Sequence, residues 1–460
     1  MRAHITTSMT RPAWRRALLI VLTVCALAIP ASASAAQAPT SADTVRDWNL
    51  YATNALGNPP TAPVMPGIGQ PPQVSVLHVG MVQGAVYDAV NAIDGGHEPY
   101  LGAPAADPSD SKAAAAAAAA HDVLIGLQVG ATPMLTPPVR DWLNAAYQDS
   151  LAAIPDGQAK DGGIAVGAAA AREMLAARAG DGRFDPFTVV DGTDPGVWRK
   201  TPPNFGADPA PWIGNVRPFL VPNVDMVRTD GPNALTSGAY AEDFNEVKKL
   251  GSLTSTSRTA DETAAAIFWQ DSGTAIWNRV FRALAQSEHL DGVDSARMLA
   301  ATNLAGADGS IGCWSEKYRW RFWRPITAIR EAASDGNPAT KADPDWLPLF
   351  NPTVPVSGAP LVTPGFSDHP SGHTCISGAF VHALQAFFGT DRIGFTATSN
   401  KCSPAPCPPR SYGRFSEALK EIIDARVWSG IHFRTADVQG AVLGKMVARY
   451  AREHYFQPVG

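Results

Sequence analysis

The sequence almost entirely lacks stretches in which apolar and polar residues alternate, the pattern that a half-buried β-strand requires. It also lacks an excess of positive charge, because 37 lysines and arginines against 42 aspartates and glutamates give a formal net charge of -5. A mildly acidic chain argues against nucleic acid or an anionic membrane as the main partner. Beyond the N-terminal leader, no apolar run is long enough to span a membrane. These absences favour an all-α protein with no integral membrane segment once its leader is removed.

Cysteine is scarce, with five residues in a chain of 460, and Cys25 lies in the N-terminal leader. Cys402 and Cys407 bracket the turn-rich sequence SPAP, and we predict that they form a local disulfide in an oxidising compartment. Cys313 and Cys375 lie in apolar runs, where they either pair with each other or remain buried thiols.

The leader has the composition of a secretory signal. Three arginines, an apolar core at residues 17–29 and the small residues PASASAA follow one another in the order that such signals have. The sequence WRRALLI fits a twin-arginine export signal as well as a general secretory signal. We therefore expect a signal peptide at residues 1–36 and a secreted or periplasmic mature protein.

Most regular segments of the mature chain have apolar residues at helical spacing. Residues 74–94 predict a helix that stops at Gly95, and a run of eight alanines follows a helix cap at Asp110 or Ser111. Thr259 and Glu262 form a capping-box pattern at the start of another helix. Further helices are predicted at residues 276–287, 295–330, 373–388, 414–427 and 436–455.

Residues 184–255 are crowded with proline and glycine, which predicts a long irregular connection between the helical parts. We therefore expect two helical bundles of the four-helix type, at residues 37–183 and 256–460, joined by this connection.

Three short motifs in the second half carry candidate functional residues. In EKYRWRFWRP, Lys317 and Arg324 are seven residues apart, so both cations would lie on one face of a helix. The alternative is a solvated basic stripe, but Trp320, Phe322 and Trp323 argue against it, because a solvated face seldom lies among so many aromatic residues.

The second motif is DHPSGH, and a helix is predicted to begin near its last residue, His373. Ser371 then lies at a helix N-terminus, where its hydroxyl and the N–H of Gly372 could bind an anion. The alternative is a serine that only caps the helix in a tight turn. His369 lines an entrance, tunes His373 or caps a turn, and the sequence leaves these three roles open.

The third motif is ARVWSGIHFRTAD, in which Arg426 and His432 are six residues apart. An unbroken helix would hold them about 120° apart. A break at Ser429 and Gly430 would let the two side chains converge; otherwise they are an ordinary arginine and histidine near a helix end. Together the motifs fit a pocket for a tetrahedral oxyanion, with three cations, two uncharged donors and two imidazoles. The residues are Lys317, Arg324, Arg426, Ser371, Gly372, His373 and His432.

Written as Lys-x6-Arg-Pro, Pro-Ser-Gly-His and Arg-x5-His, the motifs resemble those of the vanadium-dependent haloperoxidases and of the acid phosphatases that share their site. The likeness extends over DGSIGCWSEKYRWRFWRPITAIR, TPGFSDHPSGHT and VYDAVNAI, and so over most of the mature chain. It implies an all-helical fold with two four-helix bundles and a vanadate in the second.

The resemblance also implies a role for each site residue. His432 would be the axial vanadium ligand, and His373 would be the acid-base group. Asp271 matches a carboxylate that braces the site arginine and His373, and Trp314 and Phe366 match aromatic residues on the halide side. The vanadate oxygens would be hydrogen-bonded by Lys317, Arg324, Ser371, Gly372 and Arg426. Lys317 would also withdraw electron density from the bound peroxide.

One departure from the family pattern concerns the residue that orients the ligand histidine. The family places an aspartate four residues after that histidine, whereas Asp437 lies five residues after His432. On a regular helix this position points elsewhere. Either the turn is distorted, or another group orients His432.

The resemblance implies an enzyme that oxidises a halide with hydrogen peroxide to hypohalous acid, through a peroxovanadate ligated by His432, with a small organic molecule as acceptor. Two alternatives use the same pocket: a phosphatase with His432 as nucleophile and His373 as acid, and a non-catalytic oxyanion-binding protein. Trp314 and Phe366 favour the haloperoxidase. A divalent-metal hydrolase is disfavoured, since the histidines lack a carboxylate partner set.

Overall fold

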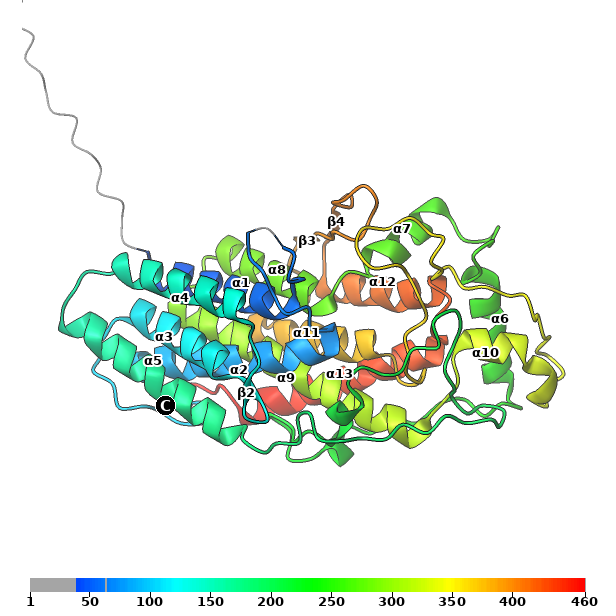
Figure 1. The fold of residues 1–460 in the computed structure, drawn as a ribbon, viewed down its shortest axis with the longest axis horizontal. Coiled ribbons are helices and arrows are strands. Elements are labelled where there is room, and N and C mark those ends of the chain that lie inside the picture. Colours follow the sequence, from blue (N-terminus) through cyan, green and yellow to red (C-terminus); the bar gives the residue numbers. More distant parts are fainter. Residues whose placement is uncertain (1–38, 63, 460) are drawn as a thin grey trace, which may run out of the picture. The chain divides into compact units, whose positions relative to one another are not determined.

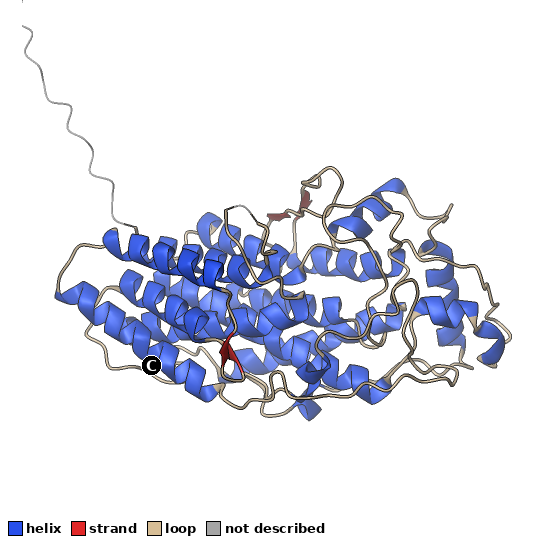
Figure 2. Ribbon diagram, in the orientation of Figure 1, coloured by secondary structure: helices blue, strands red, loops and turns tan. Residues whose placement is uncertain are grey.

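The computed structural model describes residues 39–62 and 64–459, so the expected signal peptide lies outside the described residues. Within this part the chain forms thirteen α-helices, and Figure 2 shows helices throughout it. Four short strands pair as two small antiparallel sheets, β1 (Gln128–Val129) with β2 (Thr132–Pro133) and β3 (Phe395–Ala397) with β4 (Arg410–Tyr412). The prediction of an all-α fold is confirmed.

Five α-helices lie in the first half of the chain: α1 (Ser41–Gly57), α2 (Pro72–Asp94), α3 (Lys112–Gly126), α4 (Pro137–Ala152) and α5 (Gln158–Ala177). α2 is buried along almost its whole length. The alanine run of α3 packs against α2 and α5. A Cβ atom added to Gly167 of α5 would lie only 2.4 Å from the Ala115 carbonyl oxygen of α3. The small side chains therefore let these helices approach closely, as expected for a helix inside a bundle.

Eight α-helices lie in the second half: α6 (Gly238–Leu250), α7 (Ala260–Phe268), α8 (Gly273–Ser287), α9 (Gly292–Trp320), α10 (Pro325–Arg330), α11 (Gly372–Phe388), α12 (Phe415–Trp428) and α13 (Arg434–His454). The 29-residue α9 packs against α2, α11 and α13 (Figure 1). One hydrophobic core includes buried residues of both halves. The described residues belong to one compact unit, and the boundaries of the two expected bundles remain predictions.

The expected irregular connection contains more regular structure than its sequence predicts. α6 occupies part of residues 184–255, and the prediction of an irregular segment is wrong there. Tyr240, Phe244 and Val247 recur at helical spacing and are buried, which stabilises α6 by apolar burial. Three short 3-10 helices complete the fold: η1 (Pro211–Asn215), η2 (Val224–Val227) and η3 (Ala332–Ser334).

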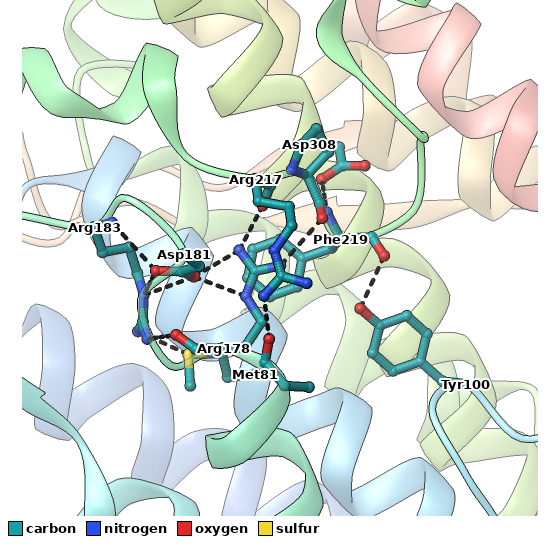
Figure 3. Close-up of polar contacts among 10 residues, drawn as sticks. Met81, Tyr100, Arg178, Asp181, Arg183, Arg217, Phe219 and Asp308 are labelled. Carbon is teal, nitrogen blue, oxygen red and sulfur yellow. Dashed lines mark hydrogen bonds and ion pairs between the residues drawn. The ribbon is translucent and has the colours of Figure 1, made fainter.

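The remainder of the connection is fastened to the helices by buried hydrogen bonds (Figure 3). Asp308 of α9 accepts hydrogen bonds from three successive N–H groups, at 2.6 to 2.9 Å, those of Phe219, Leu220 and Val221. The Phe219 carbonyl accepts a hydrogen bond from the Tyr100 hydroxyl at 2.9 Å. Because Tyr100 follows α2 and Asp308 lies on α9, the irregular segment ties the loop after α2 to α9.

The prediction of one helix over residues 295–330 is wrong, because two helices occupy this range. α9 ends before Arg321, which adopts a left-handed conformation with φ 49°. The proline that opens α10 disfavours a helical conformation at Arg324, which is extended with φ -81° and ψ 155°. Lys317 and Arg324 therefore do not share a helix face.

The four cysteines in the described part of the chain form one disulfide and leave two free thiols. Cys402 and Cys407 are bonded to each other, as predicted. Cys313 and Cys375 are free and buried, which selects one of the two alternatives that the sequence left open. In the part of the chain that the structure describes, no helix has both the length and the apolarity to cross a membrane.

Candidate active site

Two buried cations, Lys317 and Arg324, converge on one loop although the helix between them is broken. The Nε atom of Arg324 donates a hydrogen bond to the Phe366 carbonyl at 2.7 Å. Lys317 lies in the last turn of α9, and its Nζ atom donates to three carbonyl oxygens at 2.5 to 3.1 Å, those of Ser367, Asp368 and Pro370. The loop that precedes α11 therefore brings the first motif to the second.

Ser371 and Gly372 begin α11, as the sequence predicted, but Ser371 does not cap the helix with its side chain. Its backbone N–H donates to the Ala436 carbonyl at 2.9 Å, which fixes the turn against α13. A Cβ atom added to Gly372 would lie 3.0 Å from the Trp314 ring, so glycine fits this close approach. His373 follows in the first turn of α11 and lines the adjacent cavity.

The predicted break between Arg426 and His432 is present. α12 ends at Trp428, and Gly430 has φ 76°, a left-handed conformation that favours glycine. A Cβ atom added to Gly430 would lie 2.4 Å from the Gly251 carbonyl oxygen, which also requires glycine. His432 then lies two residues before α13, and both Arg426 and His432 line the cavity beside His373. The third motif therefore meets the other two.

His432 is buried between a cation and a carboxylate. Its Nε2 atom lies 3.0 Å from Nη1 of Arg324, and its Nδ1 atom lies 2.8 Å from Oδ1 of Asp368. Arg324 also donates from Nη1 to the Ile431 carbonyl at 2.8 Å. Both ring nitrogens therefore have polar neighbours at hydrogen-bonding distance.

Burial lowers the pKa values of the three cations and the two motif histidines in this site. It lowers the pKa of Lys317 to about 8, and those of Arg324 and Arg426 to about 10. Burial, with Arg426 adding to it, also lowers the pKa of His373 well below its usual value. The pKa of His432 is lowered in the same way, by burial first and by Arg324 second. Positive charge is thus disfavoured in this pocket, and a bound anion would offset that cost.

Four of the site residues carry a buried polar atom that has no hydrogen-bond partner among the described residues. These atoms are Nη2 of Arg324, Oγ of Ser371, Nε2 of His373 and Nε of Arg426. Buried polar atoms without partners are rare in folded proteins, because each costs free energy of desolvation. The atoms of Arg324, Ser371 and Arg426 can each donate a hydrogen bond. A tetrahedral oxyanion has enough acceptor oxygens to pair with all three. These residues therefore fit a vanadate or a phosphate.

Asp271 lines the same cavity, but its hydrogen bonds go elsewhere. Its Oδ2 atom accepts hydrogen bonds from Arg279 at 2.8 Å and from the N–H of Asn400 at 3.1 Å. One site arginine, Arg426, instead donates a hydrogen bond to the neighbouring residue, Gln270, at 3.1 Å. The sequence reasoning missed Gln270, although it lies in the same short stretch, FWQDSG.

The cavity has a volume of about 320 Å³ and an aromatic wall. The rings of Trp314 and Phe366 lie with their centroids 5.1 Å apart, and Lys317 lies 5.0 Å from the centroid of Phe366. Pro72 and Gln73, at the start of α2, line the cavity too. Both halves of the chain therefore shape the space beside the oxyanion pocket.

The contacts of Asp437, Asp368 and His369 were not predicted from the sequence. Asp437 is buried in the first turn of α13, and neither of its oxygens has a hydrogen-bond partner in the described chain. Asp368 occupies the position beside His432 that the family pattern assigns to a later aspartate. His369 is also buried, and its Nε2 atom lies 3.0 Å from the Thr229 hydroxyl. Asp368 was part of the quoted motif DHPSGH, but its role was not predicted.

One known family model matches the C-terminal part of the chain. Residues 297–460 match the family model of the VCPO second helical-bundle domain. A vanadium chloroperoxidase from Curvularia inaequalis is 24% identical over 208 residues, which cover 40% of this chain and 33% of that protein. The match thus spans about a third of the length of this curated relative.

Solved structures show the same fold over most of the chain. A bacterial vanadium-dependent iodoperoxidase has a TM-score of 0.70 and 22% identity, and the match covers 91% of this chain and 96% of that chain. A holo-type bacterial vanadium-dependent chloroperoxidase has a TM-score of 0.65 and 16% identity, with 88% and 96% covered. At these identities the likeness concerns the fold.

Proposed function

We propose that the protein is an exported vanadium-dependent haloperoxidase, because residues 297–460 match the family model of the VCPO second helical-bundle domain. It oxidises a halide with hydrogen peroxide to hypohalous acid, which then halogenates a small organic acceptor. The observation that carries this proposal is that four residues of the three converging motifs each have a buried polar atom without a hydrogen-bond partner among the described residues. They are the groups that a bound oxyanion would satisfy.

Vanadate, when bound, supplies a Lewis-acid centre for the activation of hydrogen peroxide. The chain holds the oxyanion by charge and by hydrogen bonds. Arg324 and Arg426 donate from planar guanidinium groups, which suit an oxyanion geometrically. Ser371 donates its free hydroxyl, and the N–H of Gly372 adds a donor at the N-terminus of α11. His432 offers a ring nitrogen as the ligand.

His373 is the acid-base group. Burial, together with Arg426, lowers its pKa well below the usual value, so its imidazole is neutral near pH 7. A neutral imidazole can accept a proton from hydrogen peroxide and return it to the departing hypohalite. Its Nε2 atom has no partner among the described residues, which leaves it free for this exchange.

The halide approaches along the aromatic wall. Trp314 and Phe366 shield this side of the cavity, and the Nζ atom of Lys317 lies 5.7 Å and 5.0 Å from the centroids of their rings. A buried cation beside an apolar wall attracts a weakly hydrated anion such as a halide. The cavity of about 320 Å³ leaves room for a small organic acceptor next to the site at which hypohalous acid forms.

Export agrees with the disulfide between Cys402 and Cys407, since such bonds persist in oxidising compartments. Detection of the mature protein, shortened by the leader, in the periplasm or the culture medium would test this part of the proposal.

Halogenation of a dimedone-type probe by purified mature protein, given bromide and hydrogen peroxide, tests the function. Activity that requires added vanadate and is suppressed by phosphate is expected, and a His432→Ala variant should be inactive. Cleavage of a phosphate ester that vanadate inhibits, without halogenation, would instead assign His432 as a nucleophile. Oxyanion binding with neither activity would indicate a binding protein.

A further inference from the structure

Asp368 lies directly beside the candidate ligand histidine. Its Oδ1 atom is 2.8 Å from Nδ1 of His432, and both side chains are almost completely buried. The backbone of Asp368 is held at both of its polar groups. Its N–H donates to the Phe322 carbonyl at 2.9 Å, and its carbonyl accepts a hydrogen bond from Lys317 at 3.1 Å. The carboxylate is therefore fixed in place by the loop that precedes α11.

The position of Arg324 indicates which nitrogen of His432 carries the proton. Nη1 of Arg324 lies 3.0 Å from Nε2 and 3.4 Å from Nδ1 of His432. A guanidinium only donates hydrogen bonds, so its closer approach to Nε2 favours a lone pair on that nitrogen. A neutral imidazole has one N–H, and a lone pair on Nε2 would place it on Nδ1, the atom that faces Asp368.

We propose that Asp368 is the positioning residue of His432. When ionised, it accepts the Nδ1 hydrogen, fixes the ring and its tautomer, and leaves the Nε2 lone pair for the oxyanion. Carboxylates that accept the second N–H of a ligating histidine commonly orient it and raise its basicity. The inference deepens the proposed function and rests on it for the identity of the bound oxyanion.

Asp437, which the family pattern favours for this role, lacks the corresponding contact. It lies on the first turn of α13, and no ion pair or hydrogen bond joins it to His432 among the described residues, whereas Asp368 lies 2.8 Å from Nδ1 of His432. Burial raises its pKa, while Ser371 and Arg426 are the neighbours that lower it most. Asp437 therefore lies near Ser371 and Arg426, which are candidate donors to the oxyanion. Asp368 is the residue that lies beside His432.

Nitrogen-15 NMR of histidine-labelled protein without oxyanion tests the proposal, with His432 assigned by the loss of its signals in His432→Ala. Burial raises the pKa of Asp368 to about 8, so the spectra are recorded at about pH 9, where its carboxylate is mainly ionised. The wild type should then show the Nδ1–H tautomer, and Asp368→Ala should shift His432 toward a mixture with Nε2–H. Asp437→Asn is the matched control and should leave the tautomer unchanged. An unchanged tautomer in Asp368→Ala, or a change in Asp437→Asn alone, would overturn the proposal.

Vanadate affinity gives a second readout by calorimetry. The dissociation constant should rise about 10- to 100-fold in Asp368→Ala, and less in Asp368→Asn, whose amide oxygen can still accept the hydrogen bond. Equal affinities in wild type and Asp368→Ala would contradict the proposal. If Asp368→Ala does not fold, the Nδ1 proton resonance of His432 in Asp368→Asn provides the test. This resonance should shift relative to wild type, because an amide oxygen is a weaker acceptor than a carboxylate. An unchanged resonance would refute the role of Asp368.

The two measurements separate this inference from the proposed function. The NMR experiment reads the protein without any oxyanion, so its outcome does not depend on whether vanadate or phosphate binds. A wild-type protein that shows the Nδ1–H tautomer and binds phosphate but not vanadate would contradict the proposed function and support the role of Asp368.

Discussion

Nη1 of Arg324 lies 3.0 Å from Nε2 of His432, although 108 residues separate the two in sequence. The arginine thus pairs with the nitrogen that would bind vanadium, while its other terminal nitrogen, Nη2, has no partner in the described chain. When an oxyanion binds, Arg324 would give up its contact with Nε2 of His432 and donate hydrogen bonds to the oxygens of the anion instead. The four unpartnered polar atoms therefore mark a pocket that the fold prepares before the oxyanion binds.

The hydroxyl of Ser371 should contribute to oxyanion affinity and not to stability. It has no hydrogen-bond partner in the described chain, so Ser371→Ala should weaken vanadate binding about tenfold and leave the melting temperature unchanged. Ser377→Ala is the matched control on the same helix, since Ser377 accepts a hydrogen bond from Trp277 at 3.0 Å. That variant should lose stability and keep its vanadate affinity. Calorimetry measures the vanadate affinity of both variants, and thermal unfolding measures their stability. If Ser371 only capped the helix, Ser371→Ala would lose stability and keep its vanadate affinity.

Gln270 should support Arg426 more than Asp271 does. Gln270→Leu removes the acceptor that lies 3.1 Å from Nη1 of Arg426, so vanadate affinity should fall about threefold to tenfold. Asp271→Asn, at the adjacent position, should have a smaller effect, because Asp271 is bonded to Arg279 and to a backbone N–H. Equilibrium titration of both variants checks this order. A larger loss in Asp271→Asn would restore the role that the family resemblance implies.

Anion binding should weaken above about pH 8 through Lys317. Burial lowers the pKa of this lysine to about 8, so below that pH the ammonium is charged and attracts an anion, and above it the amine is neutral. Sulfate is a suitable probe, because it remains a dianion across this range. Its affinity should fall about tenfold between about pH 7 and pH 10. Lys317→Met should bind sulfate weakly at every pH, and a wild-type affinity that stays constant would contradict the prediction.

The buried carboxyl of Asp88 should make folding stability depend on pH. It accepts hydrogen bonds from the N–H groups of Tyr100 and Leu101, yet burial raises its pKa to about 7 from a usual 3.8. The folded state then holds the proton more tightly than the unfolded state. Its contribution to stability is complete below about pH 4 and is lost as the pH rises through 7, with a slope of at most about 1.4 kcal/mol per pH unit.

Urea unfolding of wild type and Asp88→Asn over this range measures that contribution as a difference. Other buried acids, such as Asp308, with its pKa raised to about 6, affect both proteins alike. The difference in unfolding free energy between the two proteins should therefore shrink as the pH rises. A difference that stays constant from pH 4 to pH 8 would show that Asp88 does not titrate in this way.

Local signals in the sequence predicted local structure well. The capping box of Thr259 and Glu262 is present at the start of α7, and Gly95 ends α2 in a left-handed conformation. These features depend on residues a few positions apart, so a short stretch contains all the information. α6 was missed because the surrounding prolines and glycines obscured a helical pattern that only 13 residues carry.

The candidate site could be predicted in its composition and not in its contacts. The spacing of Lys317 and Arg324 suggested one helix face, but a left-handed residue at 321 ends the helix. Both cations still meet at the loop before α11, whose carbonyl groups accept their hydrogen bonds. The contacts of Asp368 and Gln270 depend on how that loop and the end of α7 meet distant helices, which spacing along the chain does not encode.

The most direct test of the central claim is a crystal structure of the protein soaked with vanadate, with anomalous scattering recorded at the vanadium edge. We expect a vanadium peak at bonding distance from Nε2 of His432, with oxygens that contact Arg324, Ser371 and Arg426. The Nδ1 atom of His432 should still face Asp368. A vanadium bound to other residues, or none in this pocket at a saturating concentration, would contradict the account.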